Sequence, residues 1–320
     1  MNFKEFSNGR GIKNLFVPEF YLGPECNNKC KFCSLLENEF PVKKTSDVKK
    51  ELKVLGKFTK DVKFTGGEIT LKPDIKEIIS YAKGIGFENI YIGSNGRIFK
   101  EEGYVDNMVK SGVNGFSIII HGYNQDSHEK LTGIKGSFNE TLEGIKNLLK
   151  YKVRSLTVDV VVTKSNYEHI PEIIKFLWEF KIDSVNIKFA VACGSLLIKR
   201  GDIPMISDVM PYTKTALNNF SGKNITVSYI PPCFLKGFEK YLKFVNIPSK
   251  AVIENPNFTI TVESEIEKKM IKGKVCKKCK FFDVCNGLWK EYADLYGFDE
   301  LKPVKGKKIK SLGYLKKEFG

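Results

Sequence analysis

The stretch FVPEFYLGPECNNKCKFCSLLE, residues 16–37, joins an apolar run of strand length to three cysteines, Cys26, Cys30 and Cys33. A disulfide needs an even number of thiols, and a tetrahedral structural zinc site needs four ligands. Three thiolates suit an iron–sulfur cube, which four cysteines normally hold, with one iron left open for a small molecule. The alternatives are an ordinary loop with buried thiols, or a zinc site completed by a distant residue.

Further along the chain, five more apolar runs of strand length alternate with helical patterns. Their Val, Ile and Phe content is typical of strands buried on both faces. Such alternation predicts right-handed βαβ units, a parallel sheet and the α/β fold class, but periodicity does not decide between a partial barrel and an open sheet. The five runs are DVKFT (61–65), NIYIGS (89–94), GFSIIIH (115–121), LTVDVVV (156–162) and SVNIKFA (184–190).

Helices are expected at 74–82, 139–150, 173–180 and 291–297, where apolar residues recur at helical spacing. Ser137 and Glu140 form a possible capping box for the second of them. The pattern changes near residue 224, which divides the prediction into a barrel over 1–224 and a small extension over 225–320.

The chain has 320 residues and a net charge of +15, carried almost entirely by lysine, since the only arginines are Arg10, Arg97, Arg154 and Arg200. Nucleic-acid contacts favour arginine forks, so we expect solvated lysine surfaces rather than nucleic-acid binding, while an acidic or phosphorylated substrate stays open. No apolar run is long enough for a membrane span or typical of a signal peptide, which predicts a cytoplasmic protein with no membrane partner. Eight reduced cysteines there indicate metal or catalytic ligands.

Two further motifs follow the next two predicted strands. In FTGGE, Gly66 and Gly67 permit a close approach of the backbone to a ligand, and Glu68 offers an acceptor for an ammonium group. In GSNG, Ser94 and Asn95 suit hydrogen bonds to a carboxylate or a ribose, although a plain turn explains them equally well. Because the carboxyl ends of parallel strands meet at one edge, these motifs are expected beside the cysteine loop.

The three motifs in this order resemble the radical S-adenosylmethionine (SAM) superfamily: CxxxCxxC with Phe32 before its last cysteine, then GGE, then SNG. The resemblance covers about residues 15–220, and the stretch HGYNQDSHEKLTGIKGSFNETLEGIKNLL is similar to a branch that includes molybdopterin-synthesis and peptide-maturase enzymes. It implies a partial (β/α)6 TIM-like barrel and a [4Fe–4S] cluster bound by Cys26, Cys30 and Cys33. SAM would chelate the open iron, and reductive cleavage would give a 5′-deoxyadenosyl radical that abstracts hydrogen from a substrate.

The same resemblance assigns roles to individual residues. Glu68 and the backbone near Gly66 and Gly67 would hold the SAM amino group. Asn95, Ser117 and Thr163 would face the rest of SAM. His121, after the fourth strand, is a candidate general base, although a histidine that simply packs beside SAM is the preferred interpretation.

Near its end the chain contains CKKCKFFDVCNGLWKEYADLYG, which resembles the cluster-binding extensions called SPASM and twitch. A full SPASM domain holds two auxiliary clusters on seven or eight cysteines, whereas only five of the eight cysteines remain here, so at most one auxiliary [4Fe–4S] cluster fits. A zinc site is the alternative, since CxxC is also a zinc signature. The expected ligands are Cys276, Cys279, Cys285 and, in IPPCFLKG, Cys233.

Cys193 follows the sixth predicted strand in FAVACGSL. It is interpreted as a buried small apolar residue, as a replacement for Cys233, or as a hydrogen-atom donor to a substrate radical.

The substrate class stays open between a peptide, as for a maturase of ribosomally made peptides, and a small molecule or cofactor precursor. Peptide-modifying relatives carry a leader-binding domain of roughly 80–90 residues, and none is expected before the first strand near residue 17. A flavodoxin or ferredoxin would be expected as electron donor. A non-catalytic zinc or iron–sulfur protein that binds RNA or senses redox state is the alternative function, but such a module has no need of GGE beside a tri-cysteine loop.

Overall fold

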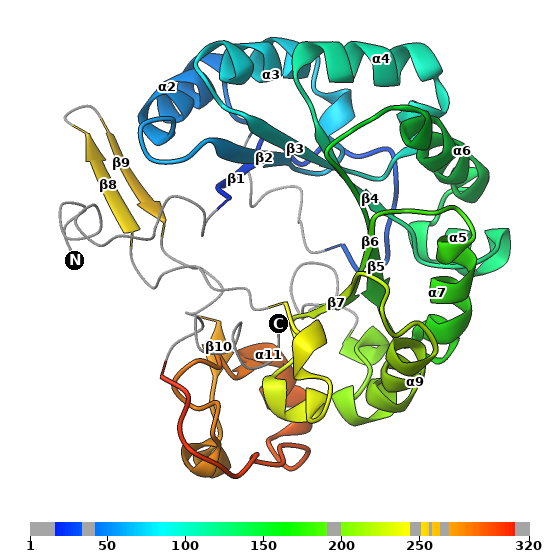
Figure 1. Ribbon diagram of the computed structural model, residues 1–320, viewed down its shortest axis with the longest axis vertical. Helices are drawn as coiled ribbons and strands as arrows, with labels where there is room; N and C mark the ends of the chain where they lie inside the picture. The colour runs from blue at the N-terminus through cyan, green and yellow to red at the C-terminus, as the bar shows by residue number, and fades with distance from the viewer. Residues whose placement is uncertain are drawn as a thin grey trace.

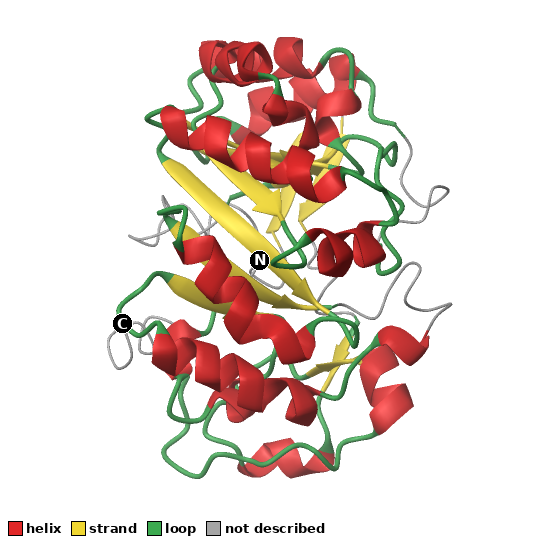
Figure 2. Ribbon diagram, turned by 90° about the vertical axis from the view of Figure 1, so that its right-hand side faces the viewer, coloured by secondary structure: helices red, strands yellow, loops and turns green. Residues whose placement is uncertain are grey.

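The computed structural model describes residues 17–33, 42–190, 200–243, 251–255, 258–262 and 269–310. Seven parallel strands form one sheet in chain order, each paired with the next. The helices lie along the outer side of this curved sheet (Figure 1), and a view turned by 90° shows them covering the strands (Figure 2). Because β1 and β7 do not pair with each other, the described strands make an open barrel, and the predicted α/β partial barrel is confirmed.

The bounds of the sheet strands are β1 (Glu19–Tyr21), β2 (Asp61–Thr65), β3 (Asn89–Ser94), β4 (Gly115–Ile119), β5 (Ser155–Val162), β6 (Ser184–Phe189) and β7 (Ile225–Ser228). The helices of the barrel are α2 (Thr45–Leu55), α3 (Ile75–Gly84), α4 (Glu102–Ser111), α5 (Gln125–Thr132), α6 (Ser137–Lys150), α7 (Ile170–Trp178) and α9 (Ile206–Asn219). No helix within the described ranges is both long enough and apolar enough to cross a membrane.

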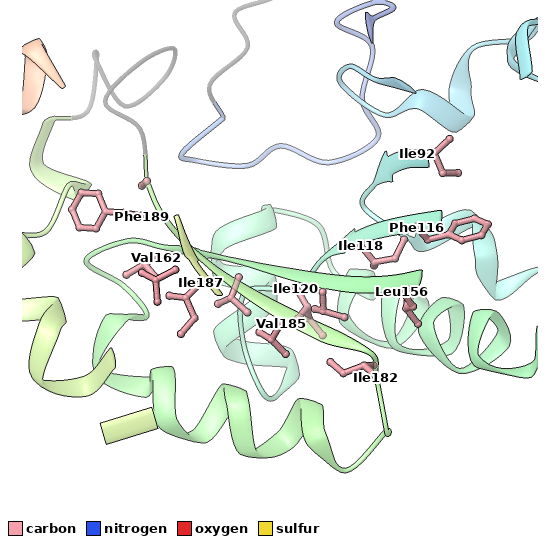
Figure 3. Close-up of a cluster of buried hydrophobic side chains, with 14 of the residues drawn as sticks. Ile92, Phe116, Ile118, Ile120, Leu156, Val162, Ile182, Val185, Ile187 and Phe189 are labelled. Atoms are coloured by element: carbon pink, nitrogen blue, oxygen red, sulfur yellow. The ribbon is translucent and has the colours of Figure 1, made fainter. Parts of the chain in front are cut away.

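The strands have two different faces, because side chains alternate along each strand. In β5, Val158 and Val160 are fully buried, and Figure 3 shows side chains of this apolar face, among them Ile187 of β6, between the strands and a helix. Thr157 and Asp159 point to the other face, which lines the inside of the barrel. The inner face is thus polar even where it is buried, as at Asp159, Asn186 and Ser228, which the Val, Ile and Phe content of the strands does not indicate.

The sheet also continues past residue 224, where the sequence predicted the end of the barrel. β7 pairs in parallel with β6, so the predicted count of six strands is one too few. Beyond β7, two small antiparallel pairs and a short helix follow. They are β8 (Ala251–Asn255) with β9 (Phe258–Val262), β10 (Met270–Ile271) with β11 (Leu288–Trp289), and α11 (Lys290–Tyr296).

Two tyrosines of α11 attach this C-terminal part to the barrel. Tyr292 is buried, and its Oη accepts a hydrogen bond from the N–H of Ile206, the first residue of α9, at 2.8 Å. Tyr296 Oη donates to the carbonyl of Ile203 at 2.6 Å. The ring of Tyr292 also meets Phe189 edge-on at the carboxyl end of β6, with centroids 5.9 Å apart. The extension thus packs against the end of the barrel at which the predicted site lies.

Candidate functional site

The cysteine loop directly follows β1, and its three thiols lie close to one another. Burial, together with the neighbouring thiols of Cys26 and Cys33, raises the pKa of Cys30 to about 12. Burial also raises the pKa of Cys26, partly offset by the backbone N–H of Asn28, which donates to its Sγ at 3.4 Å. Three mutually repelling thiolates need a positive partner, so this donor set fits a metal cluster with three protein ligands.

Hydrogen bonds hold this loop from two sides. On one side, the N–H groups of Lys29 and Lys31 donate to the carbonyls of Thr132 and Leu131 at the end of α5, at 2.8 and 3.1 Å. Gly133, which follows with φ +71°, lies so close that a Cβ there would come within 2.9 Å of the Lys29 carbonyl oxygen. The end of α5 is therefore shaped to receive the loop.

On the other side, Arg97 links the loop to α6. Its Nη1 donates to the carbonyl of Asn27 at 2.7 Å and to Oδ1 of Asn28 at 3.1 Å, while its Nε donates to Glu140 at 2.6 Å. Asn95 adds a fourth bond, from Nδ2 to Oδ1 of Asn27, at 2.6 Å. Arg97 was not among the predicted site residues. The chain has only four arginines, and the position of this one directly after the SNG motif was the signal in the sequence.

The two glycines of GGE permit close packing between loops. The N–H of Gly67 donates to the carbonyl of Gly23 at 2.8 Å, and the N–H of Glu68 donates to that of Glu25 at 2.6 Å. A Cβ on Gly67 would lie 2.2 Å from the Pro24 carbonyl oxygen, and one on Gly66 would lie 2.6 Å from that of Gly23. The glycines therefore let the segment before the cysteines lie directly against the end of β2.

The carboxylate of Glu68 is the centre of the hydrogen bonds at this end of the sheet, and the residue is only 3% exposed. Its Oε1 accepts from the hydroxyls of Ser94 and Thr70, both at 2.7 Å, and from the N–H of Thr70 at 3.1 Å. Its Oε2 accepts from the N–H of Asn95 at 2.7 Å. Ser94 Oγ also accepts from the N–H of Gly96, so in this structure the hydroxyl of Ser94 binds the carboxylate of Glu68 and orients it.

His121 packs against the cysteine loop from inside the protein. It is 2% exposed, its ring meets Phe32 edge-on at 4.5 Å, and it stacks on His128 at 5.7 Å. Burial and the neighbouring His128 lower the pKa of His121 well below its usual value, so the ring is neutral. His121 therefore packs against Phe32 of the cysteine loop, and its buried Nδ1 has no hydrogen-bond partner among the described residues.

The remaining predicted residues divide between different parts of the barrel. Thr163 is buried in a turn in which its N–H donates to Oδ1 of Asn166 at 2.7 Å. Asn166 in turn donates to the carbonyl of His121 at 3.1 Å, which ties the end of β5 to the end of β4. Ser117 points inside the barrel, where its hydroxyl donates to Asp159. Cys193 lies outside the described residues.

A cluster of polar and charged side chains lines the barrel interior. Of its members, only Ser117 was among the predicted site residues. Asp159 is 3% exposed and accepts from Lys188 Nζ at 2.6 Å and from Asn186 Nδ2 at 2.9 Å. Burial raises its pKa, but the charges of Lys188 and Lys63 outweigh burial, so the pKa of Asp159 is lowered overall. Lys63 pairs with Glu19 at 2.8 Å on the neighbouring strand.

A second group of four thiols lies in the C-terminal part. Cys233, Cys276, Cys279 and Cys285 line one pocket whose other walls include Pro232 and Phe281. Burial, together with the neighbouring thiols of Cys285, Cys279 and Cys276, raises the pKa of Cys233 to about 12. The fold thus brings Cys233 together with three cysteines that lie more than 40 positions later in the chain.

An all-thiol donor set in an apolar pocket fits an iron–sulfur cluster by its chemistry. All four cysteines are free thiols. Within the part of the chain that the structure describes, no three or more His, Cys, Asp and Glu side chains are arranged to hold a single metal ion.

Comparison with known protein families finds a match by sequence: residues 20–177 fit the Radical SAM superfamily. The curated relatives include the probable GTP 3′,8-cyclase of Saccharolobus solfataricus, 27% identical over 199 residues, which are 61% of this chain and 63% of the relative. That of Sulfurisphaera tokodaii is 26% identical over 182 residues, or 56% of each chain. The chain therefore spans less than two thirds of these relatives.

Solved structures show the same fold. The structure named native anSMEcpe with bound AdoMet matches with a TM-score of 0.59 and 14% identity, over 95% of this chain and 95% of that one. Streptococcus suis SuiB bound to the precursor peptide SuiA matches with a TM-score of 0.54 and 19% identity, over 66% of this chain and 48% of SuiB. Similarity at this level of identity extends to the fold alone.

Proposed function

Because the chain belongs to the radical SAM superfamily of enzymes, we propose that it binds SAM beside a [4Fe–4S] cluster at the carboxyl end of its barrel. When bound, these two groups supply a 5′-deoxyadenosyl radical that removes a hydrogen atom from a substrate. The observation that carries the proposal is the junction of the cysteine loop with the GGE segment through the Gly67–Gly23 and Glu68–Glu25 hydrogen bonds.

In this proposal each part of the site has one task. Cys26, Cys30 and Cys33 hold three corners of the cluster and leave the fourth for SAM. Glu68 accepts the SAM ammonium group through Oε2, because among the described residues Oε1 accepts three hydrogen bonds and Oε2 accepts one. A carboxylate has about four acceptor sites, two on each oxygen, so Oε2 retains room for one more donor.

We further propose an auxiliary [4Fe–4S] cluster held by Cys233, Cys276, Cys279 and Cys285. The shared apolar pocket and the absence of any other ligand type among its lining residues support this assignment. The extension that carries it then begins after β7, and residues 1–224 together with β7 form the barrel. Cys233 is the fourth ligand in this arrangement, which leaves Cys193 for another role.

We place a small molecule or cofactor precursor first as the substrate. The relatives that match by sequence are named as cyclases of a nucleotide, GTP. A precursor peptide is bound by SuiB, but similarity to that protein extends only to the fold. A flavodoxin or ferredoxin is the proposed electron donor, since iron–sulfur clusters of this kind have low reduction potentials.

The test is the iron, sulfide and zinc content of anaerobically reconstituted protein, with 5′-deoxyadenosine release on reduction as the assay of activity. We expect about eight irons per chain in the wild type and about four when Cys26, Cys30 and Cys33 are all replaced by Ala. The triple variant should release no 5′-deoxyadenosine. Unchanged iron in the triple variant would overturn the radical SAM assignment of the loop, and about four irons with one zinc in the wild type would make the extension a structural zinc site.

A further inference from the structure

Three lysines from separate segments reach the inside of the barrel. Lys63 lies in the middle of β2 and Lys188 near the end of β6, both on the inner face. Lys243 comes from the segment after β7: its N–H donates to the carbonyl of Val227 at 2.9 Å, and its neighbour Leu242 forms a parallel bridge with Val227. This segment therefore runs beside β7 and brings a third cation to the barrel interior.

Two of these lysines form ion pairs, whereas the third forms none with the residues that the structure describes. Lys63 pairs with Glu19 at 2.8 Å, and Lys188 pairs with Asp159 at 2.6 Å. Among the described residues, none forms an ion pair or a side-chain hydrogen bond with Lys243 Nζ. The three lysines and two carboxylates leave one excess positive charge in the barrel interior.

Lys243 nevertheless lies within electrostatic reach of all four of the other charges. Partial loss of solvation lowers the pKa of Lys243, the positive charges of Lys188 and Lys63 add to this effect, and the carboxylates of Asp159 and Glu19 oppose it. Its side chain is still exposed to solvent, so a ligand that enters the barrel can reach it. An anion that enters the barrel would be attracted by this cation and by the two neighbouring lysines.

We propose that Lys243, together with Lys63 and Lys188, binds an anionic group of the substrate, a phosphate or a carboxylate, inside the barrel. A lysine ammonium is a compact charge that binds either group without the geometric demands of an arginine fork. The described strands β1 to β7 contain no arginine. The anion would therefore be recognised by its charge rather than by the bidentate geometry of a guanidinium group. That the anion belongs to the substrate rests on the proposed function; that the site binds an anion does not.

The position of this group also suits a substrate. Lys63 and Asp159 lie within their strands, whereas the cysteine loop and Glu68 follow strand ends, so these two residues lie deeper in the barrel than the proposed SAM site. An anion held there would anchor one end of a molecule whose other end points to the carboxyl ends of the strands. Asn186 and Ser228, both buried and joined by a 2.7 Å hydrogen bond, fix the wall behind Asp159.

The experiment measures the affinity of the reconstituted holoprotein for two probes, inorganic pyrophosphate and succinate, by isothermal titration calorimetry. Lys243→Gln removes the excess charge, and Lys53→Gln, on the exposed face of α2 on the outside of the barrel, makes the same change of net charge elsewhere. We expect Lys243→Gln to weaken binding about tenfold, as for loss of one charge-assisted contact, and Lys53→Gln to match the wild type. Lys243→Arg should restore most of the affinity.

Each outcome has a distinct meaning. Loss of pyrophosphate binding alone supports a phosphate-bearing substrate, and loss of succinate binding alone supports a carboxylate. Equal affinities of Lys243→Gln and Lys53→Gln for both probes, or no binding by the wild type, would overturn the anion site. None of these measurements requires SAM cleavage, so failure of the proposed function would show separately, as no release of 5′-deoxyadenosine by the wild type.

Discussion

At the scale of single residues, the absence of a side chain at Gly67 allows the GGE segment to pack against the segment before the cysteines. A Cβ at this position would lie 2.2 Å from the Pro24 carbonyl oxygen, a separation that no real contact tolerates. We predict that Gly67→Ala lowers the free energy of unfolding by about 1–3 kcal/mol through overpacking. It should also reduce cluster incorporation, because the segment before Cys26 must move. Chemical denaturation and iron content measure the two effects.

Gly84→Ala is the matched control for this prediction. Gly84 is the last residue of α3, and nothing lies within 4 Å of a Cβ placed there. Alanine has a higher helix propensity than glycine by about 1 kcal/mol, so this variant should be as stable as the wild type or slightly more stable. If the two variants had equal stability and equal iron content, a side chain at position 67 would not be destabilising. The explanation of GGE as a site of close packing would then be wrong.

Single residues also show which parts of the site the sequence predicts. The motifs could be selected from the sequence because thiols, paired glycines and an acid after a strand are informative in isolation. The direction of a side chain is not, since Ser94 bonds Glu68 only because β3 lies beside β2 in this register. The lysines of the barrel interior were missed for the same reason. In the sequence, nothing distinguishes Lys63 from the other lysines and arginines, 52 in all, and only the sheet places it near Asp159.

At the scale of elements, the 3-10 helix η2 (Arg97–Lys100) anchors the cysteine loop to α6. We predict that Arg97→Gln speeds the release of cluster iron to a chelator at least tenfold, because it removes charge-assisted bonds to Asn27 and Asn28 worth about 1.5–3 kcal/mol each. The rate of iron chelation from reconstituted protein, followed by absorbance, measures this effect without any substrate.

The control for Arg97 lies in the same element. Lys100 also pairs with Glu140, at 2.7 Å, but no contact joins it to the cysteine loop among the described residues. Lys100→Gln should therefore release iron at the wild-type rate. Faster release from both variants would mean that Glu140 and α6, rather than the bond from Arg97 to the loop, determine how the cluster is retained.

The bounds of strands with a clear apolar pattern were predicted well. Features that tertiary contacts determine, such as the sheet partner of a short strand, were predicted less well. The runs at 61–65 and 89–94 match β2 and β3 residue for residue. β7 was assigned to the extension because its four residues carry too little pattern to indicate a sheet partner. The predicted capping box of α6 is wrong: Gly136 is its N-cap, and Ser137 lies inside the helix with its hydroxyl 2.7 Å from that of Thr132.

At the scale of the whole molecule, the fold joins cysteines that are distant in the chain. Cys233 follows the last strand of the barrel, whereas Cys276, Cys279 and Cys285 belong to the extension, and all four line one pocket. We predict that Cys233→Ala lowers iron from about eight to about four per chain, while Cys193→Ala leaves it unchanged. Colorimetric iron analysis of the two variants checks this, and the reverse pattern would make Cys193 the fourth ligand.

The same pair of variants tests the remaining role considered for Cys193. If Cys193 donates a hydrogen atom to a substrate radical, Cys193→Ala should lower product yield and deuterium incorporation from D2O while retaining iron. Full yield and full deuterium incorporation in this variant would exclude the donor role. This readout becomes possible once a substrate is identified, and the anion site of the barrel restricts that search to molecules with a phosphate or a carboxylate.

The stability of the whole molecule should depend on pH through two buried histidines at the base of the cysteine loop. Burial lowers the pKa of His121 well below its usual value, and burial and Arg97 lower the pKa of His128 to about 4. Unfolded histidines titrate near pH 6.5. Between about pH 6.5 and about 4, the unfolded state binds protons that the folded state does not, so stability is highest above pH 6.5 and falls as pH falls.

His128→Gln tests this linkage. Because a pKa difference of one corresponds to about 1.36 kcal/mol, His128 contributes about 2 kcal/mol of the stability lost between about pH 6.5 and about pH 5. The variant should lose that much less than the wild type over this interval, as measured by anaerobic denaturant unfolding at both pH values. His169→Gln, at an exposed position, should keep the wild-type dependence. An identical fall in all three proteins would mean that protonation of the cluster ligands, and not of the buried histidines, sets the acid limit.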